Sequence, residues 1–310
     1  MRKQFEEFVR RVEKEDLKIE AISVYQDGTE IFSHRWTSDR ERNIYSHTKS
    51  FVSTAVGIAI DEGVLSLEDR LVDFFPDKVP KGGNPGLEKI TLRHLLTMSS
   101  GFEARLLFMA GRRQGEGYPD YLSYMMSQPV VQEPGTRFFY SSGDSYLFGR
   151  MLEEKLQMNL AEFMYDRILR PLEIPLPIWE CCPKGHPLGG SGLFLKLSDM
   201  AKLGQLYLDE GTWKGQQIVS SAWVHEATRK QIENYELGPD GQRKTNPWYG
   251  HGYGYQFWLS EYPGSYRADG AYGQVSLVLP EYRMVIAVQC PEEGDFHPVR
   301  TALQEMIQQL

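Results

Sequence analysis

Residues 45–63 read YSHTKSFVSTAVGIAIDEG, and the interpretation of the whole chain starts from this stretch. Its apolar residues recur at helical spacing, which predicts a helix over residues 49–62. Gly63 follows the last turn, at a position where glycine commonly ends a helix. Ser46 and Lys49 stand three residues apart at the start of the pattern, so their side chains are predicted to share one face of the helix.

A serine and a lysine on one helical face can act together as nucleophile and base. At the helix N-terminus, Ser46 would lie near the positive end of the helix dipole and near free backbone N–H groups. Lys49 would have to be partly buried, because its pKa of about 10.4 must fall by about three units before it can act as a base near pH 7. The alternative is that Ser46 only caps the helix and Lys49 is a solvated surface residue. The pair therefore needs partners elsewhere in the chain.

Two other segments carry candidate partners. Residues 138–143, FFYSSG, contain Tyr140, which on its own could equally be a packing aromatic. Residues 268–274, ADGAYGQ, lead into a strand-like run and could form only a tight turn with a close backbone approach. Each segment alone leaves a structural and a functional interpretation open.

The rest of the chain predicts an α/β fold of the α+β type. A helical pattern near the N-terminus is followed by a hairpin over residues 19–36 with an Asp27-Gly28 turn. A helix over residues 197–208, strands at 276–279 and 284–289, and a C-terminal helix over 299–310 come later. We therefore expect one antiparallel sheet flanked by the N- and C-terminal helices, with a helical region inserted. The predicted core is 1–64 with 192–310, the helical region is 65–191, with helices such as 92–98, 118–126 and 146–163, and the active site lies between the two.

Composition excludes several classes of function. The formal net charge is −8 and the basic residues are scattered, so nucleic-acid binding is not expected. The N-terminus is charged from its first residues, which argues against a signal peptide, and no membrane association is expected. The three cysteines do not form a disulfide framework and no metal-ligand cluster is visible. A cytoplasmic protein without a metal or organic cofactor is the expectation.

Taken together, these segments resemble the serine β-lactamase and penicillin-binding-protein superfamily. The resemblance is to the class C β-lactamase-like branch, which includes family VIII esterases and nylon-oligomer hydrolases. It covers nearly the whole chain, because further matches are GIAIDEGVLSLED at 57–69, ITLRHLLTMSSG at 90–101 and GGSGL at 189–193. The resemblance implies a β-lactamase-like fold. It also implies that Ser46 is the acylated nucleophile, Lys49 its activating partner and Tyr140 a proton shuttle, with Ser142 at the third position of the tyrosine motif.

The family's Lys-Thr-Gly strand motif would fall on residues 268–270. The resemblance then places the second oxyanion donor on the backbone N–H of Ala271, after Gly270. Ala268 stands where the family's lysine would bind a substrate carboxylate, which argues against β-lactam turnover. Asp269 adds a negative charge near the substrate unless a cation such as Arg267 neutralises it. A neutral or cationic carboxylic ester or amide, or a short peptide, is therefore the expected substrate.

Two alternatives stay open. The chain could be a penicillin-binding D,D-peptidase or β-lactamase, or it could bind ligands through the same fold without turnover. His47 is expected at the surface or the pocket rim, pointing away from the Ser46 and Lys49 face. The sequence does not indicate an oligomeric state.

Overall fold

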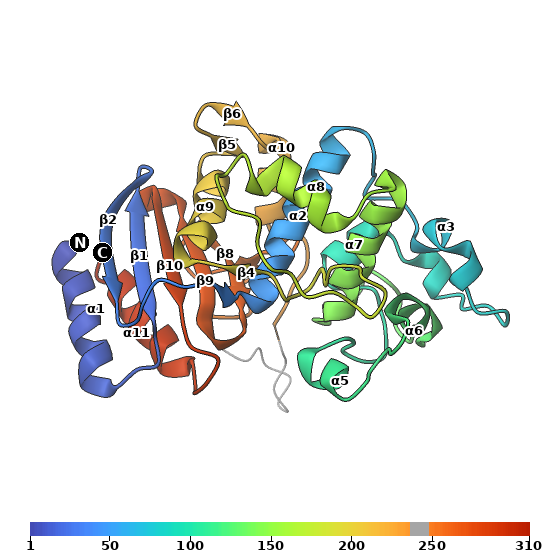
Figure 1. The fold of residues 1–310 in the computed structure, drawn as a ribbon, viewed down its shortest axis with the longest axis horizontal. Coiled ribbons are helices and arrows are strands. Elements are labelled where there is room, and N and C mark those ends of the chain that lie inside the picture. The colour runs from blue at the N-terminus through green and yellow to red at the C-terminus, as the bar shows by residue number, and fades with distance from the viewer. Residues whose placement is uncertain (236–247) are drawn as a thin grey trace.

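A six-stranded antiparallel sheet joins the two ends of the chain in the computed structural model, which describes residues 1–235 and 248–310 (Figure 1). The strands lie in the order β2-β1-β10-β9-β8-β7. Their bounds are β1 Ala21–Gln26, β2 Thr29–Arg35, β7 Trp258–Leu259, β8 Tyr266–Gly270, β9 Gln274–Leu279 and β10 Met284–Gln289. Because β1 pairs directly with β10, with Val24 opposite Ile286, the predicted sheet built from both ends of the chain is confirmed.

Two terminal helices cover one face of this sheet. They are α1, Arg2–Glu15, and α11, His297–Ile307. Alternate strand residues such as Ile22, Val24 and Ile286 form one core cluster with Phe8 and Leu303 of these helices. Side chains on a strand alternate between its two faces, so the residues between them point the other way. The α/β class with flanking terminal helices is therefore as predicted.

Two further helices lie on the opposite face. In α9, Leu197–Leu208, a Cβ added at Gly204 would lie 2.7 Å from Val285 Cγ1, so glycine lets this helix lie directly on β10. Behind it, α2, Thr48–Asp61, is buried along nearly its whole length. Its buried serine hydroxyls are paired, since Ser50 Oγ donates to Gln256 O and Ser53 Oγ to Tyr255 O. In Figure 1, α2 lies between the sheet and the helices of residues 71–164.

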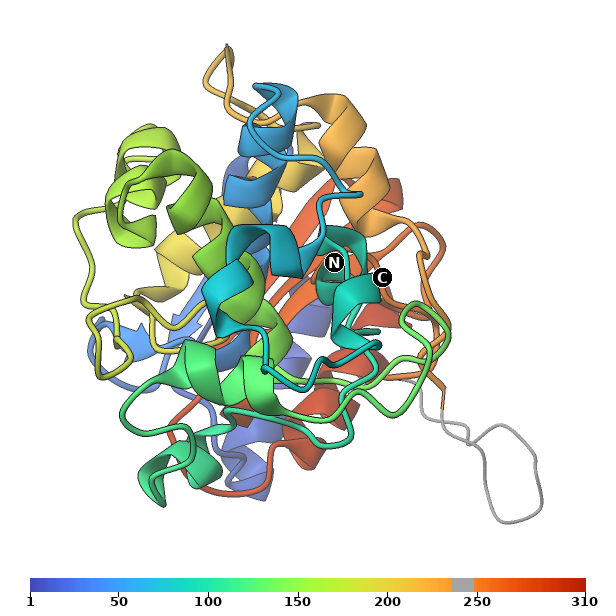
Figure 2. The ribbon, with the colours of Figure 1, turned by 90° about the vertical axis from the view of Figure 1, so that its right-hand side faces the viewer.

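The helices between 71 and 169 lie on the far side of α2, and Figure 2 shows them in front of the sheet. They are α3 Leu71–Phe74, α4 Leu92–Leu96, α5 Met109–Arg113, α6 Tyr121–Ser127, α7 Ser142–Leu156 and α8 Leu160–Met164. A single helix over 146–163 was predicted wrongly. Gln157 has a left-handed φ of 51° and ends α7, and the Asn159 side chain then accepts from the Ala161 N–H at 2.9 Å to cap α8.

Short elements complete the chain and position the site. Two two-stranded sheets are formed by β3 Arg42–Asn43 with β4 Phe194–Leu195, and by β5 Thr212–Trp213 with β6 Gln216–Gln217; α10 spans Ser221–Thr228. The first of these sheets fixes the segment before Ser46 beside residues 189–193, and the Ile44 N–H donates to Leu193 O at 2.9 Å. Within the described residues, the helices are too short or too polar to span a bilayer.

Candidate active site

Ser46 lies in a tight turn between β3 and α2. A 3₁₀ turn spans Tyr45–His47, and α2 continues from Thr48. Tyr45 has a left-handed φ of 47°, which is uncommon for a residue with a bulky side chain. The Asn43 side chain accepts from the Tyr45 N–H at 2.8 Å and holds this turn. Such strained backbone is often found at functional sites.

The Lys49 side chain is buried and reaches back to Ser46. Its Nζ lies 3.0 Å from Ser46 Oγ, 3.3 Å from Ser142 Oγ and 2.6 Å from the carbonyl oxygen of Gly190, and it donates to all three. The side chain is only 1% exposed. The alternative of a solvated surface lysine is therefore wrong for this structure, and the three predicted residues Ser46, Lys49 and Ser142 lie together.

Burial sets the protonation of this lysine. It lowers the pKa of Lys49 to about 7, and the positive charge of Arg112 acts in the same direction, while Asp144 opposes it. Burial also raises the pKa of Asp144 to about 8, against the effect of a hydrogen bond from Ser100 Oγ at 2.9 Å. Near neutral pH a large fraction of Lys49 is therefore uncharged, which a general base requires.

Tyr140 borders the same pair. Lys49 Nζ lies 5.1 Å from the centre of the Tyr140 ring. The ring packs against Trp258 and Phe108 at centroid distances of 5.3 and 6.1 Å. Burial raises the pKa of Tyr140, and a hydrogen bond with Ser46 offsets only part of this rise. The phenol is thus neutral at neutral pH and within reach of the Ser46 hydroxyl.

The end of β8 meets the Ser46 turn from the other side. A Cβ added at Gly270 would lie 2.1 Å from Ile44 O and 3.2 Å from the backbone nitrogen of His47, so only glycine fits there. Ala271 follows and is exposed, in a turn spanning Ala271–Gly273. The two predicted oxyanion segments are therefore in backbone contact.

Asp269, the negative charge predicted beside the substrate, is paired with two arginines. Asp269 Oδ2 accepts from Arg267 Nε at 2.9 Å and from Trp248 Nε1 at 2.8 Å, and Arg300 Nη2 lies 3.4 Å from Oδ1. Burial alone would raise the pKa of Asp269, but the charges of Arg300 and Arg267 hold it below its ordinary value. Asp269 therefore gives no reason to exclude an anionic substrate.

The expectation for His47 was half wrong. Its ring points away from Lys49, as expected, but it is fully buried rather than at the surface or rim. Nε2 lies 2.8 Å from Ser276 Oγ, and that hydroxyl donates to Met200 O, so Nε2 carries the proton. Burial lowers the pKa of His47 to about 3. His47 is a neutral packing residue between α2 and the sheet.

Four residues at the site were not predicted from the sequence: Asn43, Gly190, Arg112 and Asp144. Gly190 lies in a segment that the resemblance had matched, but its carbonyl contact with Lys49 depends on the fold. Asp144 lies among small and polar residues at the start of α7, where an acidic residue is common, so its burial had no local indication. Arg112 comes from α5, 63 positions after Lys49, and no spacing rule connects the two.

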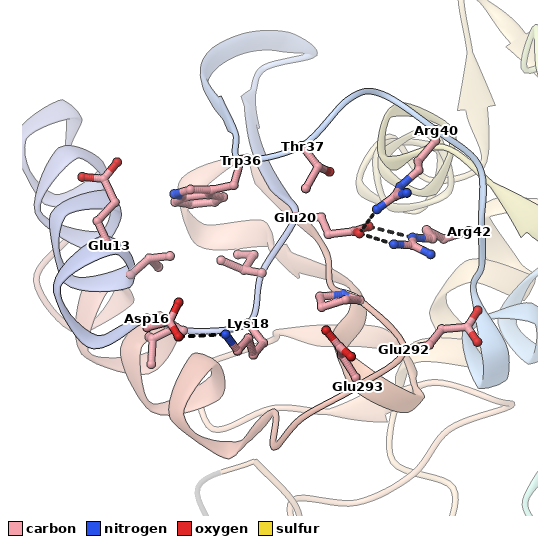
Figure 3. Close-up of a pocket in the computed structure, with 14 residues that line it drawn as sticks. Glu13, Asp16, Lys18, Glu20, Trp36, Thr37, Arg40, Arg42, Glu292 and Glu293 are labelled. Atoms are coloured by element: carbon pink, nitrogen blue, oxygen red, sulfur yellow. Dashed lines mark hydrogen bonds and ion pairs between the residues drawn. The ribbon is translucent and has the colours of Figure 1, made fainter.

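A separate cavity of about 580 Å³ lies away from these residues, between α1 and the segments after β2 and β10 (Figure 3). Figure 3 shows Glu20 bound by Arg40 and Arg42 at one side and the indole of Trp36 at another. None of the residues around Ser46 lines it. This cavity is therefore not the place where the predicted chemistry would occur.

Comparison with known proteins agrees with this geometry. The sequence profile of the beta-lactamase family matches residues 9–307. The chain belongs to the beta-lactamase family. The predicted recognition and class, a β-lactamase-like serine hydrolase, are confirmed at the level of this family.

Several proteins that resemble the chain are distant from it in sequence. A Salmonella typhi protein provisionally named D-alanyl-D-alanine carboxypeptidase is 20% identical over 84% of this chain and 72% of its own length. A Bacillus anthracis protein provisionally named 6-aminohexanoate-dimer hydrolase superposes with a TM-score of 0.77 at 18% identity, over 96% of this chain and 80% of that one. A family VIII carboxylesterase superposes with a TM-score of 0.73 at 17% identity, over 99% of this chain and 97% of that one. These solved structures confirm the predicted fold.

Proposed function

We propose that this protein hydrolyses a carboxylic ester or amide through an acyl-enzyme on Ser46. The observation that carries the proposal is the buried contact of 3.0 Å between Lys49 Nζ and Ser46 Oγ. A buried lysine with a pKa near 7 can accept the serine proton, whereas a solvated one cannot. Burying a lysine side chain costs free energy, and a lysine with only a structural role would not recover this cost at such a position.

The proposed reaction uses the groups around this pair. Lys49, assisted by Tyr140, removes the proton of Ser46, and Ser46 Oγ attacks the substrate carbonyl. The backbone N–H groups of Ser46 and Ala271 hold the tetrahedral oxyanion. Tyr140 then protonates the leaving group, and water hydrolyses the acyl-enzyme. We place substrate entry between the sheet core, 1–64 with 192–310, and the helical region, 65–191.

The substrate class follows from the family and from residue 268. Similar proteins carry the names of a carboxylesterase, an amide-dimer hydrolase and a D-alanyl-D-alanine carboxypeptidase. Ala268 is buried and has no charge with which to bind a β-lactam carboxylate. We therefore propose an ester or amide rather than a β-lactam. A chromogenic cephalosporin tests the alternative, and its rapid hydrolysis would favour the β-lactamase or D,D-peptidase assignment. The cytoplasmic setting stays a prediction.

The covalent step can be tested directly with an activated phosphonate. The wild-type protein is expected to gain the mass of one phosphonyl group, because the oxyanion donors and Lys49 activate a single serine. Digestion and mass spectrometry should place the label on Ser46. Ser46→Ala should take up no label, whereas Ser50→Ala, one helical turn away with a structural hydrogen bond to Gln256 O, should label normally. Equal labelling of Ser46→Ala would refute the assignment, and absence of labelling in the wild-type protein would favour the non-catalytic alternative.

The pH dependence of kcat/KM provides a second test. Below the Lys49 pKa of about 7 the lysine is protonated and cannot accept the serine proton. With a nitrophenyl ester, kcat/KM is expected to fall about tenfold per pH unit below pH 7 and to be level from about pH 8. Tyr140 stays neutral in this range because its pKa is raised. A profile that is flat from pH 5 to 9, after subtraction of the rate in buffer, would exclude Lys49 as the base.

A further inference from the structure

A second cation, Arg112 of α5, is held beside the proposed catalytic lysine without a close carboxylate. Its side chain is 12% exposed. Nη2 donates to Ser191 Oγ at 3.0 Å, and the nearest carboxylate, Glu180, lies 4.0 Å from Nη1 and is about half exposed. Within the described residues the buried Nε has no hydrogen-bond partner. A buried guanidinium with an unsatisfied donor costs free energy unless a ligand completes its contacts.

The backbone links Arg112 directly to the reaction site. Ser191 accepts from Arg112, and the preceding residue, Gly190, accepts from Lys49 through its carbonyl. The charge of Arg112 also acts on Lys49, whose pKa it helps to lower. A group of the substrate that reached Arg112 would therefore lie beside the backbone segment that also holds Lys49.

The surroundings of Arg112 favour a negative ligand. Of the acidic groups that face it, Glu116 is already engaged, because its Oε1 accepts from the Leu107 N–H and the Tyr124 hydroxyl. The other, Glu180, lies 4.0 Å from Arg112 Nη1 with its side chain about half exposed. Two more arginines of the same segment border the site. The Arg105 guanidinium lies 5.4 Å from the Phe139 ring, next to Tyr140, and the charge of Arg113 acts on Tyr45, next to Ser46.

We propose that Arg112 binds a carboxylate of the substrate and so supplies, from the helical region, the cation that is absent at Ala268. This specificity rests on the proposed function of the same site. Arginine suits the role because its planar guanidinium binds a carboxylate through two parallel hydrogen bonds. The expected substrate is then an ester or amide that carries a free carboxylate, rather than the neutral or cationic one that Ala268 and Asp269 indicated.

Two pairs of matched esters test this specificity. The first pair, mono-4-nitrophenyl glutarate and 4-nitrophenyl pentanoate, differs by a carboxylate on the acyl side. The second, 4-acetoxybenzoate and 4-acetoxybenzamide, differs by a carboxylate on the leaving group. The wild-type protein is expected to hydrolyse the anionic member of one pair with a kcat/KM about ten to a hundred times higher than that of the neutral member, after subtraction of the rate in buffer.

Variants of Arg112 separate carboxylate binding from the tuning of Lys49. Rates are compared at pH 9, about two units above the Lys49 pKa of about 7, and as the ratio between the two members of a pair, on which a change in Lys49 protonation acts equally. Arg112→Gln should lose the preference for the anionic ester while the neutral ester is still hydrolysed, and Arg112→Lys should keep part of it. Arg10→Gln, an exposed residue of α1, is the control and should behave as wild type. An unchanged preference in Arg112→Gln, or an equal loss on both members of a pair, would overturn the proposal.

Binding without turnover distinguishes this inference from the proposed function. Calorimetric titration with each of the two anionic esters should show that Ser46→Ala binds at least one of them at least about tenfold tighter than Ser46→Ala/Arg112→Gln does. If the wild type hydrolyses both pairs without preference, the inference on Arg112 fails and the hydrolase proposal stands. If it hydrolyses neither pair, the proposed function fails. The titration then still decides the inference, because equal affinity of the two variants would overturn it.

Discussion

Lys49→Met is expected to lower kcat/KM for a nitrophenyl ester by about 10⁴-fold at pH 8. Methionine has nearly the length of lysine and fills the buried space below Ser46, but it cannot accept the serine proton. The midpoint of thermal unfolding is expected to stay within about 4 °C of the wild-type value, because the lost hydrogen bonds to Gly190 and Ser142 are offset by the removal of a buried, poorly solvated amino group. Stopped-flow hydrolysis and calorimetry measure the two quantities.

A second lysine variant tests whether the loss of kcat/KM is specific to Lys49. Lys155→Met replaces an exposed lysine at the end of α7 and should change neither kcat/KM nor the unfolding midpoint appreciably. Retention of more than a tenth of the wild-type kcat/KM by Lys49→Met would contradict the role of Lys49 as the base.

Asp269→Asn is expected to have the largest effect on stability, a loss of about 3–5 kcal/mol in the free energy of unfolding. The substitution leaves the fully buried guanidinium of Arg267 without its ion-pair partner, and it also removes the contact with Arg300. Urea unfolding followed by tryptophan fluorescence measures this loss. Because the pKa of Asp269 is held below 3.8 in the folded protein, the contribution is present above that pH and should diminish as the pH falls through this range.

An exposed ion pair provides the comparison for Asp269. The side chains of Arg70 and Asp73 are 57% and 52% exposed at a separation of 2.8 Å, so Asp73→Asn should cost less than about 1 kcal/mol. A loss in Asp269→Asn no larger than that in Asp73→Asn would show that the hydrogen bonds Arg267 already donates to Ser260 Oγ and Trp248 O are enough to hold its guanidinium.

Much of the fold could be predicted because it depends on local patterns. The α9 helix was predicted with both bounds correct, and the Asp27-Gly28 hairpin and the helix after Ser46 were found from periodicity and turn residues. Local rules failed where two helical patterns adjoin. Apolar residues recur at helical spacing over residues 146–163, and only the backbone at Gln157 and the cap at Asn159 divide this stretch.

In the candidate site, too, local features could be predicted from the sequence and long-range contacts could not. The sequence by itself determined that Ser46 and Lys49 share a helical face, because three residues make nearly one turn of a helix. Only the tertiary structure decided that Lys49 is buried, that His47 is a neutral packing residue and that Asp269 is paired. Burial and charge compensation depend on segments far apart in sequence, such as α5, β8 and residues 189–193, which local spacing does not relate. Arg112 is the clearest case, because only the folding of α5 over the site brings its charge to Lys49.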